Sequence, residues 1–418
     1  MQGWLGLCWR FFLAREGYSV SVYERRPDPR KRSLDSGRSI NLALSSRGIF
    51  ALEKVGLMER VRKCMLPMRG RALHDSLGGI TFQAYGQRDH EVIYSVARCQ
   101  LNTLLLEAAE ETGKVHVHFH HTCTRVDFCK RQLTFYDEVQ GRSRCVVFTQ
   151  VMGTDGSGSR IRKAILAQGG TQNVEKPLGH GYKELLIAPT SGGGFSLQSD
   201  ALHIWPRGEF MQIALPNLDG SFTATLFMPQ QGEQSFQAID TETKLQQFYG
   251  EHFRDSLDLM PDLAQDYFNN PTGNLMTVKC VPWHYQDQAL ILGDAAHAIV
   301  PFHGQGMNCG FEDCVALVDC LEKAASWDEG FQSFEALRKP NTDAIADLAL
   351  ANYVEMRSQV RDRDFHLKKQ IAFYLESLYP DFFIPQYSMV MFHQTPYYWA
   401  QQIGEIQERI LDLWVDVL

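Results

Sequence analysis

The segment that most constrains the fold is 293–314, which reads GDAAHAIVPFHGQGMNCGFEDC. The apolar run 289–292 just before it predicts a buried parallel strand, with Asp294 at the carboxyl end of that strand. A proline and three glycines predict an irregular loop to about Met307, after which 308–322 has helical apolar spacing. Together these features predict a cradle for a phosphorylated or anionic group, because backbone N–H groups and the helix dipole point at it. The alternative is an ordinary strand–loop–helix turn.

Composition sets broad limits on the class of protein. At 418 residues, with 44% hydrophobic and 22% charged residues, the chain can build a large core and two or three domains. A net charge of −8 without a basic stripe argues against nucleic-acid binding. Ten cysteines without CxxC pairs favour a reducing compartment. No run approaches the roughly 20 apolar residues of a membrane helix, and the apolar start lacks the basic region of a signal peptide.

The beginning of the chain predicts an altered dinucleotide-binding unit. A strand at 18–23 ends at Glu24, whose carboxylate is placed to accept hydrogen bonds from ribose hydroxyls. The three glycines of a GxGxxG turn would fall on Met1, Gly3 and Gly6, so the first glycine and the strand before it are missing. We therefore expect either that an N-terminal piece is lacking or that the dinucleotide binds weakly.

Two arginines in the segment PMRGR are candidate ligands for an anion. Arg69 and Arg71 are two residues apart and share a face if the segment is a strand. A guanidinium in that position can bind a carboxylate through two parallel hydrogen bonds. A surface arginine is the alternative for either residue taken alone.

Three histidines in an alternating strand at 114–119 and just after it invite a metal interpretation. His116, His118 and His120 would lie on one face. No acidic or cysteine partner has convincing spacing, so a half-exposed edge face is favoured and no metal is expected.

Periodicity predicts several other elements. Helices are expected at 46–55, 101–112 and 242–260. A strand is expected from Val146 to Gly153, followed by an acid–glycine turn and a helix.

The second half of the chain predicts a sheet followed by helices. Short alternating runs in 180–285 are separated by Gly, Pro, Asn and Asp and indicate an antiparallel sheet. Beyond residue 322 the pattern is helical, with Pro340 starting a long amphipathic stretch. Asn352 and Glu355 lie one turn apart in that stretch.

These motifs together resemble the FAD-dependent aromatic hydroxylase family, and within it the enzymes that hydroxylate kynurenine. The GDAAH segment is shared by many flavin hydroxylases, and the acid–glycine turn after Gly153 resembles their DG motif. More specific to the kynurenine-hydroxylating enzymes are PMRGR, LHIWPR and NYVEM, and the resemblance also covers GRSINLALSSRG, HGYKEL and FIPQYSMV.

The resemblance implies an α/β fold: a Rossmann-like FAD-binding domain with an inserted antiparallel β-sheet substrate domain and a C-terminal helical region. The FAD-binding domain would be discontinuous and lack its first strand, covering 1–60, 92–175 and 275–330. The substrate-binding sheet would cover 61–91 and 176–274, and the helical region 331–418.

The resemblance also implies the site residues. Arg71 would bind the substrate carboxylate, with Tyr85, Asn352 and Tyr387 around that end and Phe227 in the apolar wall. The loop 301–303 would lie beside the flavin ring. FAD would be bound by Leu5, Tyr23, Glu24, Arg25, Arg26, Ala43, Arg98, Cys123 (through its backbone), Asp294, Met307 and Asn308.

The implied reaction is hydroxylation of L-kynurenine at ring carbon 3, with NADPH as a transient reductant and O2 as co-substrate. The oxygen would come from a C4a-hydroperoxide of the flavin. Because the substrate's own amino group activates its ring, no protein acid or base is obligatory. The protein must orient the ring and exclude water. The location would be cytoplasmic, or the cytosolic face of the mitochondrial outer membrane if a C-terminal anchor is missing, which allows association with a membrane surface.

Two alternatives stay open at the level of sequence. One is a flavin hydroxylase of another aromatic acid, which would share GDAAH without needing Arg71, Asn352 and Tyr387. The other is a non-catalytic relative that keeps the fold and has lost FAD, because the first strand is absent.

Overall fold

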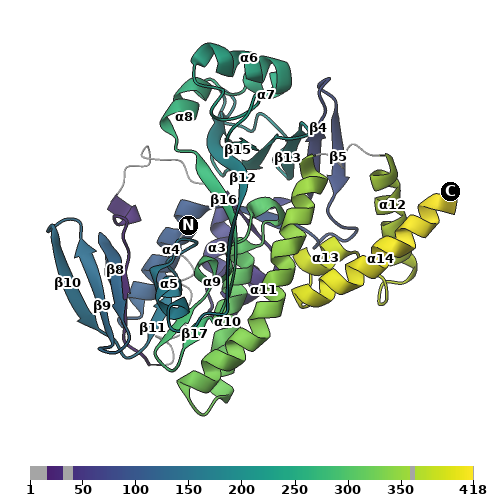
Figure 1. Cartoon of the computed structure of the whole chain (residues 1–418). Coiled ribbons are helices and arrows are strands. Elements are labelled where there is room, and N and C mark those ends of the chain that lie inside the picture. The colour runs from purple at the N-terminus through teal and green to yellow at the C-terminus, as the bar shows by residue number, and fades with distance from the viewer. Residues whose placement is uncertain (1–16, 32–40, 358–362, 418) are drawn as a thin grey trace.

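The computed structural model describes residues 17–31, 41–357 and 363–417. A seven-stranded sheet, several smaller sheets and two long helices make up its centre (Figure 1). The positions Met1, Gly3 and Gly6, on which the three glycines of a GxGxxG turn would fall, lie outside the described residues.

Parallel strand pairs form the part of the molecule that carries the GDAAH segment. Strand β18 (Ala289–Ile291) is fully buried and pairs in parallel with β11 (Val151–Gly153). Strand β1 (Val20–Tyr23) pairs in parallel with β7 (Val115–His118), which follows helix α4 (Arg98–Glu111). Parallel neighbours need crossover connections, so this part has the α/β character that the sequence predicts.

Smaller antiparallel sheets flank these pairs. One has the order β2 (Asn41–Leu44), β6 (Ile93–Ala97), β3 (Met65–Met68), and a second the order β10 (Arg142–Val147), β9 (Gln132–Asp137), β8 (His121–Asp127). Strand β17 (His284–Tyr285) adds to β18 in antiparallel orientation.

The seven-stranded sheet joins segments that are far apart in the sequence. Its order is β16 (Gly273–Val281), β12 (Gln172–Ile187), β15 (Phe222–Pro229), β14 (Met211–Pro216), β13 (Ala201–Pro206), β4 (Gly70–His74), β5 (Ile80–Ala84). All neighbours are antiparallel except β4 and β13, which run parallel. Strand β4 therefore enters this sheet from an early segment of the chain.

The helices pack against the sheets and against one another. They are α2 (Ser46–Lys54), α3 (Met58–Val61), α5 (Arg160–Leu166), α6 (Glu242–His252), α7 (Arg254–Leu257), α8 (Leu263–Asn269), α9 (Asp294–His297), α10 (Gly306–Lys323), α11 (Trp327–Arg357), α12 (Arg363–Leu378), α13 (Gln386–Met391) and α14 (Tyr397–Val417), with 3-10 turns η1 (Pro29–Lys31), η2 (Arg62–Cys64) and η3 (Pro301–His303). Residues of α6 and α8 share a core with Phe222, Ala224 and Leu226 of β15, whereas Phe227 packs with residues of α11 and η3. The alternation predicted along this strand is confirmed. In Figure 1, α12–α14 lie beside β4 and β5.

The expected strand from Val146 to Gly153 is wrong. Strand β10 ends at Val147 and β11 starts at Val151, in a different sheet. Between them the Phe148 amide still donates to the backbone oxygen of Arg131 at 3.0 Å on the hairpin, whereas the Val151 amide donates to that of Gln288 at 2.8 Å, so the chain changes sheets between these residues.

Two helix predictions also need correction. The helix expected over 242–260 is interrupted at Phe253, whose φ of −135° and ψ of 40° end α6 before α7 begins. Pro340 does not start the long helix but lies inside α11. The helix begins earlier because Ser326 Oγ accepts from the Glu329 amide at 3.2 Å while the Glu329 carboxylate accepts from the Ala325 amide at 2.8 Å. This reciprocal pair is close to a capping box.

Within 17–31, 41–357 and 363–417, none of the helices combines the length and apolar character that crossing a bilayer requires.

Candidate active site

The predicted anion ligand Arg71 lies in the interior. It projects from β4, where its residue is 5% exposed, and its Nη1 donates to Glu355 Oε1 of α11 at 2.9 Å. This contact joins an early strand to a late helix. A buried arginine with one carboxylate partner keeps further N–H groups for another anion.

Two tyrosines from different segments surround this guanidinium. The Arg71 Cζ lies 5.8 Å from the ring centre of Tyr85 and 5.0 Å from that of Tyr387. The two rings stack on each other with centroids 5.5 Å apart, and His303 stacks on Tyr387 at the same distance. Burial raises the pKa of both tyrosines and lowers the pKa of His303 to about 4, so these three side chains are neutral at pH 7.

Two polar atoms at this place lack partners. The Tyr85 hydroxyl and His303 Nδ1 are buried, and neither has a hydrogen-bond partner among the described residues. Buried polar atoms are nearly always paired in native proteins, so such atoms around one guanidinium indicate the binding of a polar ligand.

The apolar side of the site is built around η3. Asn352 of α11 donates through Nδ2 to the backbone oxygen of Phe302 at 2.6 Å. The Phe302 ring lies 5.0 Å from that of Phe227 and stacks on Tyr353 at 3.9 Å. The five predicted substrate residues thus form two groups, Arg71 with the two tyrosines and Asn352 with Phe227, and η3 connects them through adjacent residues Phe302 and His303.

Two ionisable residues at this site were not among the predicted ligands. Glu355 is the ion-pair partner of Arg71, and its position one helical turn after Asn352 was the only signal in the sequence. Lys369 of α12 feels the charges of both Arg71 and Glu355, and burial with the Arg71 charge lowers its pKa to about 8. The sequence gives no signal for Lys369, because its position depends on how α12 packs.

The GDAAH turn is more ordered than predicted. Residues 294–306 were expected to be irregular, yet they contain α9 and η3, and α10 starts at Gly306. The turn starts at Gly293, which has a φ of 59° that favours glycine. The buried carboxylate of Asp313 fixes this turn by accepting from the Gly293 amide at 3.0 Å and His297 Nε2 at 2.6 Å.

The start of α10 and strand β2 form the predicted cradle. Asn308 accepts from the Ser45 amide at 2.9 Å and donates to the backbone oxygens of Ala43 at 2.8 Å and Gly304 at 2.9 Å. A Cβ at Gly48 would lie 2.5 Å from Asn308 Oδ1, so only glycine allows this close approach.

The cradle fits the polar parts of FAD. No side chain of the described residues caps the N-terminus of α10, which leaves its first amides available to an acceptor. The partly buried acid Asp294 and the partly buried Arg98 interact by charge at the same place. Asp294, Met307, Asn308, Ala43 and Arg98 are therefore the residues that would hold the cofactor here.

The remaining predicted FAD residues lie at and after the end of β1, where burial and the nearby Arg26 charge lower the pKa of the cradle residue Arg98. Tyr23 ends β1 and stacks between Phe135 at 4.1 Å and His118 at 4.8 Å. Glu24 accepts from Arg26 Nε at 3.1 Å. Arg25 lies between them in the chain, and Leu5 is outside the described residues.

The acid–glycine turn after β11 has a structural explanation. Asp155 Oδ2 accepts from the Arg160 amide at 2.6 Å, and Asp155 Oδ1 accepts from the Ser159 hydroxyl, so this acid stabilises the start of α5. Cys123 lies nearby, and its pKa is raised to about 11 by burial and by the Asp155 charge.

Neither set of possible metal ligands supports a metal site. His120 does not continue the face of His116 and His118, because β7 ends at His118 and His120 has a φ of 61°. In the described parts of the chain, His297, Cys309 and Asp313 are the residues whose ligand atoms gather closely enough to hold a metal ion.

A guanidinium occupies the neighbourhood of that group. Arg338 donates through Nε to Asp313 Oδ1 at 2.8 Å and through Nη2 to Cys309 Sγ at 3.3 Å. A positive charge already neutralises the carboxylate, which disfavours a cation at the same place.

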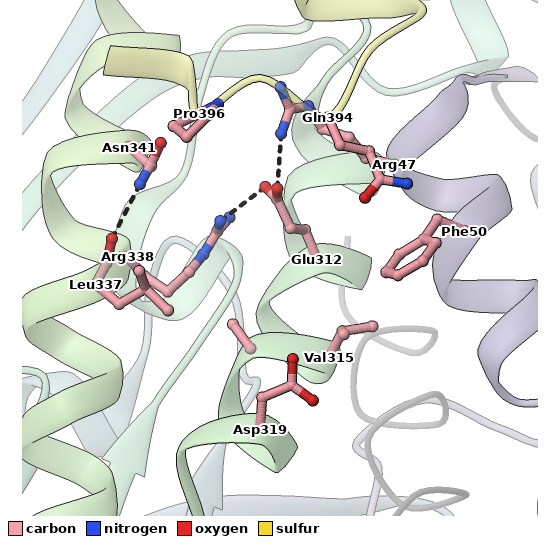
Figure 2. A pocket seen from close by; sticks show the side chains of 11 residues that line it. Arg47, Phe50, Glu312, Val315, Asp319, Leu337, Arg338, Asn341, Gln394 and Pro396 are labelled. Atoms are coloured by element: carbon pink, nitrogen blue, oxygen red, sulfur yellow. Dashed lines mark hydrogen bonds and ion pairs between the residues drawn. The ribbon is translucent and has the colours of Figure 1, made fainter. Parts of the chain in front are cut away.

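A pocket of about 210 Å³ lies between α2, α10 and α11 (Figure 2). Its wall contains Glu312, whose carboxylate contacts Arg47 Nη1 at 2.6 Å and Arg338 Nη1 at 2.7 Å. These contacts tie α2, α10 and α11 together. The lining shares no residue with the predicted substrate or FAD sets, so we assign this pocket a structural role.

Comparison with solved structures and family models gives the class. A family model described as an FAD binding domain matches residues 3–179 and 273–349. The tetrameric 2-methyl-3-hydroxypyridine-5-carboxylic acid oxygenase has a TM-score of 0.68 at 19% identity, covering 85% of this chain and 91% of that one. P. aeruginosa PqsL in complex with 2-aminobenzoylacetate has a TM-score of 0.67 at 19% identity, covering 86% and 95%. The fold is that of the FAD-dependent aromatic hydroxylases, as predicted.

Curated relatives narrow the assignment. Kynurenine 3-monooxygenase of Myxococcus xanthus (strain DK1622) is 48% identical over 409 residues, covering 98% of this chain and 88% of that protein. The enzyme of the same name from Stenotrophomonas maltophilia (strain K279a) is 44% identical over 416 residues, covering 98% and 90%. The chain belongs to the kynurenine 3-monooxygenase family, and it is an FAD-dependent monooxygenase.

Proposed function

We propose that this protein hydroxylates L-kynurenine at ring carbon 3, using bound FAD, NADPH and O2. The observation that carries the proposal is the buried Arg71, which has one carboxylate partner and faces two neutral tyrosines. An amino-acid substrate brings both a carboxylate and an ammonium group. Arg71 binds the carboxylate through its remaining N–H groups, and Glu355 accepts the ammonium.

The aromatic end of the substrate lies on the apolar side of the site. Phe227, Phe302 and Tyr353 form a wall of stacked and tilted rings there. Asn352 holds the Phe302 backbone, so η3 keeps a fixed position beside the substrate ring. Bound FAD, reduced by NADPH, supplies the activated oxygen. The role of the protein is to fix the ring and exclude water from it.

The test compares NADPH oxidation by the FAD-loaded protein with and without L-kynurenine. We expect L-kynurenine to accelerate NADPH oxidation and to yield 3-hydroxykynurenine in proportion. D-Kynurenine and 4-hydroxybenzoate are matched controls, since they alter the amino-acid end and the ring respectively. Faster turnover with 4-hydroxybenzoate than with L-kynurenine would favour a hydroxylase of another aromatic acid. A purified protein without flavin absorbance that does not take up added FAD would favour the non-catalytic alternative.

The domain limits and the location are also proposals. We keep the FAD-binding segments 1–60, 92–175 and 275–330, the substrate segments 61–91 and 176–274, and the helical region 331–418. The relatives named above are bacterial, and they give no support to the mitochondrial outer membrane or to membrane-surface association. Cell fractionation with detection of the protein in each fraction tests the location.

A further inference from the structure

A chain of three hydrogen bonds connects β4, β13 and α7 on the sheet face opposite Arg71. His74 Nδ1 lies 2.8 Å from Asp255 Oδ2, and His74 Nε2 lies 2.8 Å from His203 Nδ1. His203 Nε2 lies 2.8 Å from the backbone oxygen of Gln198. Both imidazoles are 1% exposed, so no water competes for these contacts.

The three hydrogen bonds of this series need three hydrogens, which is one more than two neutral histidines carry. Each of the three contacts needs one hydrogen, and a carbonyl oxygen and a carboxylate supply none. A neutral imidazole carries a single N–H, so two neutral rings satisfy two contacts and leave two acceptors facing each other at the third. The arrangement of His74, His203 and Asp255 therefore requires a third proton.

The third proton belongs to His74. Asp255 is held in its ionised form because Oδ2 also accepts from Trp205 Nε1 at 2.7 Å, and hydrogen bonds from His74 and Trp205 outweigh burial to lower its pKa. Burial and the His74 charge lower the pKa of His203 to about 4, so the pair holds one extra proton and not two. His74 then donates from both nitrogens, and His203 accepts at Nδ1 and donates from Nε2.

We propose that His74 is a buried imidazolium paired with Asp255, and that this pair clamps β4, the strand that carries Arg71, against β13 and α7. The backbone pairing of β4 with β13 runs from Gly70 to Leu73. His74 comes next, and its side chain continues the attachment beyond the last paired residue. On its other side β4 has only the edge strand β5.

Among the groups around His74, Asp255 is the counter-ion of the imidazolium. The Trp205 ring stacks on His74 with centroids 4.0 Å apart, a contact that favours a cation. Arg207 donates to the backbone oxygens of His74 at 2.9 Å and of Asp75 at 3.1 Å. His252, at the end of α6, has a pKa lowered by burial and is neutral at pH 7.

Asp200 is the other carboxylate near this chain of contacts. It accepts from the Gln198 side chain at 2.9 Å, so it lies beyond Gln198 rather than against either imidazole. The positive charge on His74 is therefore matched by one carboxylate in direct contact.

The sign of the pH dependence follows from the extra proton. A free histidine has a pKa of about 6.5, so the unfolded chain releases most of this proton by pH 7.5 while the folded protein keeps it. Folding therefore takes up a proton above pH 6.5, and the stability that the pair contributes falls as the pH rises over that range. In the pH range where only the folded protein holds the proton, this pair makes the unfolding equilibrium constant rise about tenfold per pH unit.

The test uses the FAD-loaded protein, Asp255→Asn and the control Asp258→Asn, which changes an exposed acid next to α7. Urea unfolding is measured between pH 6 and 9. We expect the unfolding constants of the parent and Asp258→Asn to rise about tenfold more per pH unit than that of Asp255→Asn. Equal slopes for all three proteins would overturn the proposal.

A second measurement needs no variant. In protein labelled with ¹⁵N-histidine, the nitrogen shifts at pH 7.5 report which ring nitrogens carry protons. We expect one buried imidazole with protons on both nitrogens, coupled to a neighbouring imidazole with one. Two neutral rings at this pH would overturn the proposal.

The expected effect of the clamp on substrate binding by Arg71 rests on the proposed function. It is measured separately, through the KM for L-kynurenine. We expect the KM for L-kynurenine to rise with pH in the parent protein and to be higher and flatter in Asp255→Asn. A protein that shows the doubly protonated ring but does not turn over kynurenine would keep the clamp and refute the function.

Discussion

Two buried arginines, Arg71 and Arg338, show how the same side chain serves binding in one place and architecture in another. Each lies in the interior against a glutamate of a neighbouring element. Arg338 uses all three of its nitrogens, on Asp313, on Glu312 and on the backbone oxygen of Cys309. Arg71 has one carboxylate partner among the described residues, Glu355.

The difference teaches that burial of a charge is a poor guide to function until its partners are counted. Around Arg338 the buried carboxylate of Asp313 receives three donors, and each guanidinium nitrogen of Arg338 already has a partner. Around Arg71 the Tyr85 hydroxyl and His303 Nδ1 are unpaired. Unused capacity, rather than charge, distinguishes the substrate end.

The largest effect that tests this comparison is expected for Arg71→Met. Truncating one partner of a buried, hydrogen-bonded charge pair in a binding interface costs about 2–5 kcal/mol, so kcat/KM for L-kynurenine should fall by about thirtyfold to several thousandfold. The FAD content should not change, because Arg71 does not touch the cradle. Steady-state kinetics on flavin-normalised protein measures this.

Arg69→Met, an exposed neighbour, is the matched control and should stay within about twofold of the parent. Unchanged kinetics in Arg71→Met would remove the proposed anchor.

The opposite phenotype is expected for Arg338→Met. It leaves Asp313 without its buried guanidinium and Glu312 with Arg47 as its remaining partner, which should lower the free energy of unfolding by about 3 kcal/mol and weaken FAD retention through the Gly293 turn. The KM of the protein that still carries FAD should match the parent. Urea unfolding and flavin absorbance after gel filtration report both effects. Arg131→Met breaks an exposed ion pair with Asp287 and should change stability by less than about 1 kcal/mol. A higher KM with normal stability would reverse the roles assigned to the two arginines.

A smaller effect is expected for Glu355→Gln. The amide keeps the shape but loses the charge that holds the substrate ammonium, so KM should rise about tenfold while kcat changes much less. Initial rates over a range of L-kynurenine concentrations give both constants. Asp347→Asn, on the same helix in an exposed pair with Lys279, is the control. If kcat falls and KM does not, Glu355 acts on the reaction rather than on binding.

The smallest effect concerns pH and Lys369. Since the pKa of this lysine is about 8, its positive charge near Arg71 is present below that pH and lost above it. The attraction for the substrate carboxylate should therefore weaken between pH 7 and 9, and KM should rise about two- to threefold for one partly screened charge. Lys369→Met should remove this contribution and leave the part of the rise that Asp255→Asn removes. A parent KM that is independent of pH over the same range would contradict this assignment.

Local patterns in the sequence predicted the parts of the fold that depend on neighbouring residues. The apolar run before Asp294 forms a buried strand, and the alternation along 222–227 divides that strand between two cores. The serine and glutamate at 326 and 329 would have placed the start of α11 correctly, had the capping pattern been given more weight than Pro340.

Contacts between distant segments could not be predicted in this way. The parallel pairing of β4 with β13 leaves no periodic signal in either strand. Glu355 lies 284 residues from Arg71, and only the packing of α11 brings them together. For the same reason Asp313 looked like an ordinary helical acid, although its carboxylate folds back to the Gly293 turn.

The stacked ring of Tyr387 comes from a short helix late in the chain, whereas the guanidinium that it covers is on an early strand. As the chain leaves the ribosome, the GDAAH strand and its cradle are complete well before the last aromatic wall has been synthesised. The substrate side therefore cannot close until Tyr387 has been synthesised, whereas every residue of the cradle precedes it in the chain.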